Sequence, residues 1–375
     1  MNKPTLAIFH NNFTTFDYEK FRIKKIKKNY NIIYLNLSLL LNLQKQYSKK
    51  LNNKDYIYIN SIFDLYKYLK SHKNIYILDL LGISFKPKLS LIRILINHFA
   101  IGILPVIGLR YRISNMYISK GYKKNFEKTF NFICKLLFKN FTFRNYHLIL
   151  SGKYNENFYK GLSKNKPFFT YSADYQKYLD IKNNYKPKKK YAVFLEENLV
   201  DHPDYYHSAQ GFPPISEKDY YKLMNFFFFK FKSKFNCNII ISAHPKSPIN
   251  KIKKNFAKYK VFQGNTQNLI KNSSYVIGHA STAFSYAVLF NKKIFFANFY
   301  KIKDAFVGRE IDMTSELLDS NTVYLDKNFN LEKNKKKINK FAYKSYVTNF
   351  LKHQKCKNYS FDKIFNHKLK NLYKN

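Results

Sequence analysis

The sequence predicts an α/β protein with two doubly wound, Rossmann-like domains that face a cleft. Its 375 residues exceed what one hydrophobic core usually supports, and a 45% share of hydrophobic residues is enough for globular domains. Short β-branched and aromatic runs alternate with helical patterns, which is typical of βαβ units in a mostly parallel sheet. A polar, basic and proline-broken segment at 183–190 is the expected linker.

The pattern divides the chain into three parts. We expect an acceptor-side domain at residues 1–185, a nucleotide-donor-binding domain at 186–330 and a basic helical tail at 331–375 that could pack back across both. In the first domain the expected strands are 6–9, 32–35, 56–59, 75–80 and 147–150, with a crossover helix through Ile62, Leu65, Tyr66 and Leu69. In the second domain they are 191–195, 238–242, 259–262, 275–277 and 293–297.

Two helices carry informative side chains. Ser216 to Asp219 form a capping-box pattern that predicts a helix over 220–235, and we interpret its four consecutive aromatics, Phe226 to Phe229, as buried between the sheet and its neighbours. Another helix, around 123–139, has an apolar stripe among lysines. It is interpreted as a packed surface helix, with contact to a membrane surface as the alternative.

The chain is strongly basic, with a formal net charge of +44. The lysines are spread over the whole sequence, so two explanations stay open: compositional drift, or attraction to polyanions such as anionic lipid headgroups or phosphate-bearing acceptors. Three cysteines without ligand spacing and the lack of a signal peptide favour the cytoplasm. The apolar stretch 94–109 is broken by Gly and Pro, so we expect no spanning helix and at most peripheral contact with the inner membrane face.

The expected chemistry lies where parallel strands end, because ligands bind outside the carboxyl ends of such strands. Glu196-Glu197-Asn198 follows the strand 191–195, and either carboxylate could be the general base that deprotonates an acceptor hydroxyl. A solvated acidic loop explains the pair equally well. The residues that could take the same role are Asp201, His202, Asp204 and His207.

Two further turns are candidates for contacts to a donor phosphate. His244-Pro245-Lys246 follows the strand 238–242, so the imidazole can donate a hydrogen bond to a leaving phosphate and Lys246 adds positive charge. At the next turn Gly264 lets the backbone pass close to a ligand and Thr266 can cap a short helix. A structural histidine and a plain strand-to-helix turn are the alternatives.

The fourth turn, after the strand 275–277, contains His279, Ser281 and Thr282. Small hydroxyl residues at a helix N-terminus, with free amides and the positive end of the helix dipole, make a phosphate site. Ordinary N-capping would also explain the hydroxyl pair. The chain has no DxD motif and its histidines lack ligand spacing, so we expect no metal site and no cofactor, with the nucleotide sugar bound as a substrate.

These motifs resemble the nucleotide-binding half of bacterial GT-B transferases, over roughly 191–297. In the bacterial sialyltransferases and polysialyltransferases an acidic pair followed by Gly, a His-Pro pair and a hydroxyl pair imply a base and two donor-phosphate contacts. Glu196-Glu197, His244-Pro245 and Ser281-Thr282 would fill those places, with Asn198 where the family has Gly. CDP-glycerol glycerophosphotransferases are similar in the same region.

The leading hypothesis is a metal-independent glycosyltransferase of the GT-B fold. It would move a sugar from a nucleotide-activated donor, with a CMP-sugar favoured, to a cell-surface polysaccharide or lipid-linked glycan. A glycerophosphotransferase using CDP-glycerol and a nucleotide-sugar epimerase are alternatives of the same fold. A basic nucleic-acid-binding protein is the alternative from another class, and it is disfavoured because most aromatic residues fall inside strand and helix patterns.

Overall fold

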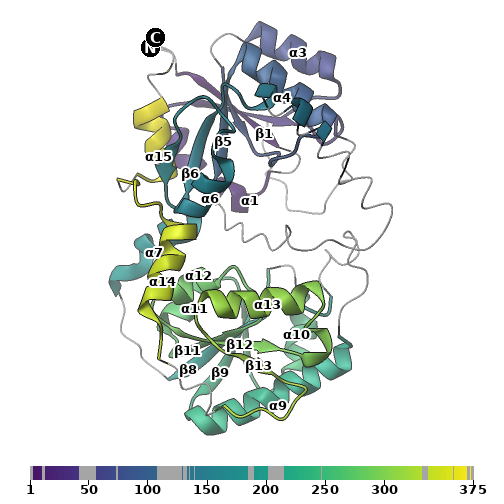
Figure 1. The fold of residues 1–375 in the computed structure, drawn as a ribbon, viewed down its shortest axis with the longest axis vertical. Coiled ribbons are helices and arrows are strands. Elements are labelled where there is room, and N and C mark those ends of the chain that lie inside the picture. The colour runs from purple at the N-terminus through teal and green to yellow at the C-terminus, as the bar shows by residue number, and fades with distance from the viewer. Residues whose placement is uncertain are drawn as a thin grey trace. The chain divides into compact units, whose positions relative to one another are not determined.

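The structure is a computed structural model whose described residues divide into two compact units (Figure 1). It describes residues 3–10, 13–41, 56–72, 75–107, 129, 133–134, 136–138, 140–184, 190–201, 215–245, 247–331, 337–357, 359–369 and 372. The first unit takes its described residues from Met1–Arg110, Ile118–Ala173 and Asn349–Asn375, and the second takes them from Asp174–Thr348.

The first unit is built on a parallel sheet with the strand order β3-β2-β1-β4-β5-β6-β7. The strands are β1 Thr5–His10, β2 Asn31–Asn36, β3 Tyr56–Tyr58, β4 Ile75–Asp79, β5 Ile101–Val106, β6 His147–Ser151 and β7 Phe168–Thr170. The order reverses between β1 and β4, which is the topological switch point of a doubly wound sheet.

The sequence did not predict β5 and β7. Gly102 and Pro105 were interpreted as interruptions of an apolar stretch, but both suit β5. A Cβ at Gly102 would lie 2.7 Å from the ring of Tyr146, so a side chain does not fit there. Pro105 lies beyond Ile103, the last β5 residue paired with β4, so its missing N–H removes no bond on that side.

Helices cover both faces of the first sheet. They are α1 Thr15–Lys20, α2 Ile23–Ile26, α3 Ile62–Ser71, α4 Pro87–Phe99, α6 Gly152–Tyr159 and, near the C-terminus, α15 Phe361–Ile364 followed by a π-helical turn at Phe365–Leu369. The predicted crossover helix is α3, which buries Leu65 and Leu69. The C-terminal turn is fixed to the sheet because the hydroxyl of Tyr76 donates to the carbonyl of Leu369 over 2.6 Å.

The second unit has a parallel sheet with the order β10-β9-β8-β11-β12-β13. Its strands are β8 Tyr191–Leu195, β9 Asn238–Ala243, β10 Lys260–Gln263, β11 Tyr275–Gly278, β12 Lys293–Asn298 and β13 Thr322–Tyr324. The first five match the predicted strands, and β13 is a short addition. Two doubly wound α/β sheets are therefore confirmed, while the cleft between them stays a prediction.

The helices of the second unit are α7 Ala173–Ile181, α9 Glu217–Phe235, α10 Ile249–Asn255, α11 Thr266–Asn272, α12 Phe284–Leu289, α13 Phe306–Leu317 and α14 Lys340–Tyr346. This unit begins at Asp174, whose carboxylate accepts hydrogen bonds from Ser285 and Tyr286 of α12 at 2.8 and 3.1 Å. Residues 185–189 of the expected linker lie outside the described residues. The expected tail divides at Thr348, where the second unit ends.

Helix α9 covers one face of the second sheet and begins as predicted, with the Ser216 hydroxyl accepting from the N–H of Asp219. Phe227 and Phe228 are fully buried, but Phe226 and Phe229 are 47% and 68% exposed, so the prediction that all four are buried was wrong. Consecutive residues of a helix point around its whole circumference, and the sheet covers only one side. Most of the other predicted helix, 123–139, lies outside the described residues.

Within the described part of the chain, no helix is long and apolar enough to cross a bilayer. The three cysteines, Cys134, Cys237 and Cys356, are buried thiols, and the Sγ of Cys356 lies 3.8 Å from the carbonyl of Tyr359. They therefore pack as small apolar side chains.

A buried ion pair lies at the carboxyl end of β4 in the first unit. Arg93 of α4 and Asp79 are both almost fully buried, and their Nε and Oδ2 atoms are 2.7 Å apart. The guanidinium also donates to the carbonyls of Ser84 and Gly82, and its Cζ atom lies 4.6 Å from the ring centroid of Phe143. The charge of Arg93 is thus fully compensated only while Asp79 is ionised.

We expect Asp79→Asn to destabilise the first unit by about 3–5 kcal/mol, because it leaves a buried guanidinium without a counter-charge. Hydrogen exchange of the β4 amides, followed by mass spectrometry, measures this loss without assuming that both units unfold together. The double variant Asp79→Leu/Arg93→Met removes both charges and should recover most of the protection. Unchanged protection in Asp79→Asn would contradict the role given to the pair.

His10 ends β1 as a buried imidazole, and among the described residues neither of its ring nitrogens has a hydrogen-bond partner. The rings of Phe13, Tyr34 and Tyr56 surround it at centroid distances of 5.4, 6.4 and 5.5 Å. Burial lowers the pKa of His10 to about 4. The folded chain therefore keeps this ring neutral at pH values where an unfolded chain protonates it.

We expect the free energy of unfolding to fall as the pH drops from about 6.5 to 4, with His10 accounting for up to about 3 kcal/mol. The unfolded state takes up the proton first, so the full stability is present above pH 6.5. Urea unfolding of His10→Leu at pH 7 and pH 4.5 should show a flatter pH dependence than the native chain. The exposed His98→Leu serves as the control, and equal slopes in all three proteins would refute the assignment.

Candidate functional site

The predicted site residues of the second unit collect at the carboxyl ends of β9, β8 and β11. The strand order reverses between β8 and β11, so the turns after these two central strands diverge. Glu196 and Glu197 follow β8, His244 follows β9, and the 279–282 turn follows β11. The structure thus places the predicted turns at one edge of one sheet.

Glu196 connects the β8 turn to the β9 turn. Its side chain is almost fully buried, and one oxygen accepts from the N–H of Asn198 at 2.5 Å. The other oxygen accepts from the Ser247 hydroxyl at 2.7 Å and the N–H of His244 at 3.2 Å. Burial raises the pKa of Glu196, and these hydrogen bonds oppose the rise. Both oxygens are occupied, so Glu196 is a positioning residue of the turn.

Glu197 reaches in the opposite direction, to the turn after β11. Its carboxylate accepts from the N–H of His279 at 3.0 Å and from the N–H of Ala280 at 3.0 and 3.1 Å. Burial raises the pKa of Glu197 to about 8. The negative charges of Glu310 and Glu196 also raise this pKa, whereas the backbone hydrogen bonds lower it. A carboxyl group with this pKa exchanges its proton near neutral pH, as general acid–base chemistry requires.

The ring of His279 is not at the predicted phosphate site. It is fully buried, with Nδ1 2.7 Å from the carbonyl of Ala297 and Nε2 3.2 Å from the hydroxyl of Tyr220. A carbonyl only accepts, so Nδ1 carries the proton and Nε2 accepts from Tyr220. Burial lowers the pKa of His279 to about 4. This neutral ring belongs to the core, which corrects the expectation that it contacts the donor.

Ser281 and Thr282 lie at the surface end of the same turn. Helix α12 begins at Phe284, and its N-cap residue is Ala283, which makes no side-chain cap bond. Ser281 is half-buried and its hydroxyl accepts from the N–H of Ala283 at 3.3 Å, whereas Thr282 is exposed. Among the described residues, no hydrogen bond involves the backbone N–H of either. Neither residue is the N-cap, and donors at this turn remain open to a ligand.

The β9 turn is held by its backbone. The carbonyl of His244 accepts from the side-chain amide of Gln263 at 2.9 Å, and that amide also donates to the carbonyl of Ser247 at 3.1 Å. The side chain of His244 is half-buried and Pro245 is exposed. Lys246 lies outside the described residues. The turn is therefore clamped between Glu196 and Gln263 with its histidine at the edge of the sheet.

The β10 turn agrees with the prediction at Gly264 and differs at Thr266. Gly264 has a φ of +80°, and no atom lies within 4 Å of the position of a Cβ, so the backbone faces open space. Asn265, not Thr266, is the N-cap of α11, and the Thr266 hydroxyl lies 2.8 Å from that of Ser242 at the end of β9. Thr266 joins two neighbouring turns and does not cap the helix.

Asn198 explains how the acidic pair can lack the glycine of the resembling family. Its φ is 55°, in the left-handed region that glycine adopts most easily and asparagine next. The side-chain amide of Asn198 donates to the carbonyl of Asp201 at 3.0 Å and closes the turn. Asp201 itself pairs with Lys251. The other residues proposed as substitute bases, His202, Asp204 and His207, lie outside the described residues.

Sequence reasoning missed Glu310 of α13, the helix that follows β12. Burial raises the pKa of Glu310 to about 7, and its carboxylate acts electrostatically on Glu197. Within the described chain, its carboxylate takes part in no hydrogen bond. The sequence does show a carboxylate in a helix that follows a strand, which could have suggested a site residue. An ordinary amphipathic surface helix has the same pattern, so the residue was not singled out.

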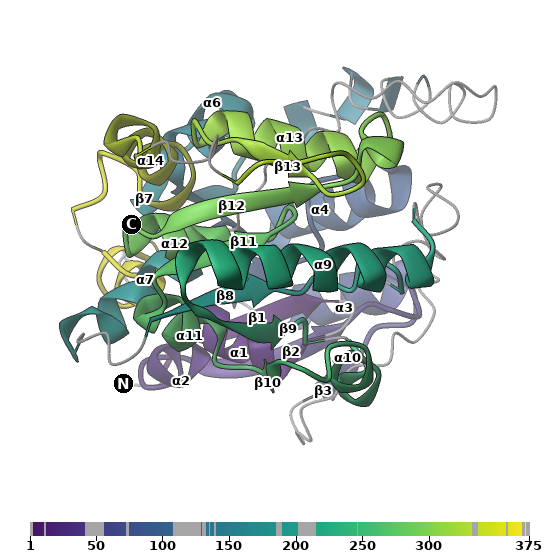
Figure 2. The same ribbon diagram turned by 90° about the horizontal axis from the view of Figure 1, so that it is seen from below.

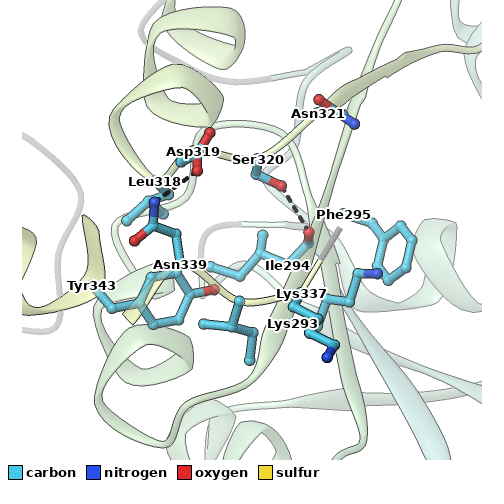
Figure 3. A pocket seen from close by; sticks show the side chains of 11 residues that line it. Lys293, Ile294, Phe295, Leu318, Asp319, Ser320, Asn321, Lys337, Asn339 and Tyr343 are labelled. Atoms are coloured by element: carbon cyan, nitrogen blue, oxygen red, sulfur yellow. Dashed lines mark hydrogen bonds between the residues drawn. The ribbon is translucent and has the colours of Figure 1, made fainter. Parts of the chain in front are cut away.

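Two cavities lie elsewhere in the second unit. A small one of about 20 Å³, the room of one water molecule, lies at the amino end of β12 (Figure 3). Bonds from Asn339 to Asp319 (2.7 Å) and from Ser320 to the carbonyl of Ile294 (3.2 Å) close it. This end is opposite to the ligand-binding edge of a parallel sheet, so the cavity is structural.

The larger cavity, about 860 Å³, is open and lies beside β13. In it the ring centroid of Tyr300 lies 4.2 Å from the ammonium of Lys303 and 4.3 Å from that of Lys327. The hydrogen bond from Lys303 and both positive charges lower the pKa of the Tyr300 phenol. No pattern in the sequence singled out this basic and aromatic surface.

No family model and no curated protein match the chain. Among solved structures, a UDP-GlcNAc 2-epimerase from Methanocaldococcus jannaschii is similar at 15% identity, with 99% of this chain and 100% of that chain covered and a TM-score of 0.48. A variant of the wall teichoic acid polymerase TagF has 13% identity, coverage of 100% and 90%, and a TM-score of 0.49. S. aureus MnaA bound to UDP has 10% identity, coverage of 84% and 88%, and a TM-score of 0.42. Likenesses this distant carry no argument about the activity of this chain.

We expect Glu196→Ala to lower the free energy of unfolding by about 2–4 kcal/mol, because buried N–H and hydroxyl donors at two turns lose their acceptor. Glu196→Gln keeps one acceptor oxygen and should cost less. Urea unfolding measures both, with Glu217→Ala as a control that removes an exposed carboxylate and changes stability by less than about 1 kcal/mol. If Glu196→Ala matched that control, Glu196 would not be a positioning residue.

Proposed function

We propose that the chain is a glycosyltransferase that moves a sugar from a nucleotide-activated donor, with a CMP-sugar favoured, to a cell-surface polysaccharide or lipid-linked glycan. The observation that carries the proposal is the set of open donors after β11. The N–H groups of Ser281 and Thr282 and the exposed Thr282 hydroxyl lie at the switch point of a doubly wound sheet, where such sheets bind their ligands.

The donor phosphate would lie against this turn and the His244 turn. These two turns flank β8, since β9 and β11 are its neighbours in the sheet. Backbone N–H groups and a hydroxyl fixed by the fold stabilise developing negative charge without reorganising, and an imidazole adds a hydrogen bond to the leaving phosphate. The scheme needs no resident metal or cofactor, because these donors supply the charge stabilisation.

Glu197 would transfer the proton, and Glu310 would contact hydroxyl groups of the donor. Glu196 and Glu197 each accept three hydrogen bonds, so engagement does not distinguish them. We assign the proton transfer to Glu197, because its pKa, raised to about 8, lets it exchange a proton near neutral pH. Glu310, whose carboxylate has no hydrogen bond among the described residues, suits the vicinal hydroxyls of a ribose or a sugar. Both assignments concern the same nucleotide site.

A thermal-shift panel of CMP, CDP, UDP and GDP tests the proposal. A nucleotide at 100 times its Kd stabilises the native state by about 2.7 kcal/mol, which raises the melting temperature by about 5–10 °C in a domain of this size. We expect CMP or CDP to give the largest shift. His244→Ala should remove most of it, and Thr282→Ala, which deletes the exposed hydroxyl but keeps the backbone N–H, should reduce it.

Ser233→Ala, an exposed serine of α9, is the matched control and should keep the full shift. Turnover of a CMP-sugar with a glycan acceptor then distinguishes glycosyl transfer from turnover of CDP-glycerol or epimerisation of the sugar alone. If no nucleotide raises the melting temperature, or if generic RNA binds equally well to His244→Ala and the native chain, the proposal is refuted.

A further inference from the structure

The outward face of α9 combines exposed aromatic rings with lysines. Phe229 is 68% and Phe226 47% exposed, although the neighbouring Phe227 and Phe228 are fully buried. The exposed lysines of the same face stand before and after these rings in the sequence. They are Lys218, Lys222, Lys230 and Lys232.

This arrangement follows from helical geometry. At 100° per residue, positions 218, 222, 226, 229 and 233 lie on one side, and Lys230 and Lys232 flank that side. The opposite side inserts Met224, Phe227 and Phe231 into the core. Figure 2 shows α9 as the outermost layer on its face of the second sheet. On the outward side the ring of Phe226 lies beside that of Phe329, with 6.1 Å between the centroids, and Lys230 also lies over the Phe329 ring. Packing within this unit therefore accounts for one side of the helix and part of the other, and leaves the exposure of Phe229 unexplained.

The charge on this outward side is mainly positive, because its four lysines outnumber Asp219, which the 100° spacing also places on this side. The two acidic residues of α9, Glu217 and Asp219, lie in its first turn, and Glu217 pairs with Lys251 of α10 at 2.7 Å. Lys230 also lies over the ring of Phe226, 4.9 Å from its centroid, so the ring and the ammonium form one surface. Phe229 stands between Lys222 and Lys232 on this side.

We propose that α9 docks on an anionic lipid bilayer, with its axis parallel to the surface, Phe229 inserted at the headgroup level and the four lysines on lipid phosphates. A cationic helix face with exposed aromatics is what interfacial helices use, and the charge complements an anionic leaflet. The 19 residues of α9 span about 28 Å, enough to place all these side chains on one plane. The lysine stems lie along the apolar boundary while their ammonium groups stay in water.

Membrane docking by α9 would bring the chain to a lipid-linked acceptor. The biological reason for docking rests on the proposed function, but the docking surface itself does not. None of the six side chains belongs to the nucleotide site. Vesicle binding and the nucleotide thermal shift are therefore separate measurements, and either can fail while the other succeeds.

Co-sedimentation of the full chain with vesicles of phosphatidylcholine, with and without phosphatidylglycerol, tests the proposal. We expect binding to the anionic vesicles that weakens with salt. Phe229→Ser should reduce the partition coefficient about tenfold, from the loss of one buried aromatic side chain. Lys222→Glu/Lys230→Glu should reduce it at least about 30-fold, since each lysine contributes about 1 kcal/mol.

The controls make the same chemical changes on α14 of the same unit. Phe341→Ser removes a ring that is 82% exposed, and Lys340→Glu/Lys344→Glu removes the same charge as the double variant on α9. Both should bind vesicles like the native chain, and all variants should keep the native melting temperature. Equal losses from the two helices would mean that only net charge matters and would overturn the proposal. So would a Phe229→Ser variant that binds vesicles fully but sediments as a smaller oligomer, because α9 would then join two copies of the chain.

Discussion

The second unit depends on how backbone donors are satisfied where its sheet reverses order. Parallel strands on the two sides of β8 lead into turns that diverge, and the N–H groups at the start of each turn lose their ladder partners. The chain meets this constraint with two consecutive carboxylates. Glu196 reaches the β9 turn and Glu197 reaches the β11 turn. One dipeptide thereby fixes both turns of the candidate site.

This arrangement changes which groups can meet a ligand. The N–H groups of His279 and Ala280 lie in the turn where the sequence predicted a phosphate site, but Glu197 accepts hydrogen bonds from both. Within the described chain, the open donors of this turn are those of Ser281 and Thr282. The buried His279 ring also stabilises this turn, because its hydrogen bond to the carbonyl of Ala297 connects the end of β11 to the end of β12. The donors that stabilise the fold and those proposed to bind phosphate thus belong to successive residues of one short segment.

The sequence predicted the sheets well because a buried parallel strand is recognisable on its own. Tyr191 to Leu195 and the other central strands are apolar runs between polar turns, and their length and position follow from that contrast. Strand β5 was missed because Gly102 is explained only by the ring of Tyr146, which lies 44 residues further along the chain. Tertiary contacts of this kind leave no local pattern.

The sequence predicted where the turns of the candidate site lie better than it predicted what each side chain does there. The rule that ligands bind at strand carboxyl ends located the turns at Glu196, His244 and His279. Roles depend on where side chains point, and that is decided by burial: His279 turned inward to Ala297, Thr266 turned to Ser242, and Phe229 turned outward. The sequence could not single out Glu310, because what distinguishes this residue is its nearness to Glu197, which follows a different strand.

The coupling between Glu197 and Glu310 bears on how an anionic donor could bind beside two acidic residues. If both were fully ionised, they would repel a phosphate at the adjacent turn. Burial raises their pKa values to about 8 and about 7, so at neutral pH the pair carries less than its full charge. A bound phosphate would favour the protonated forms further, because its negative charge raises both pKa values. Nucleotide binding should therefore take up protons, and the site can accept an anion locally without any contribution from the chain's net charge of +44.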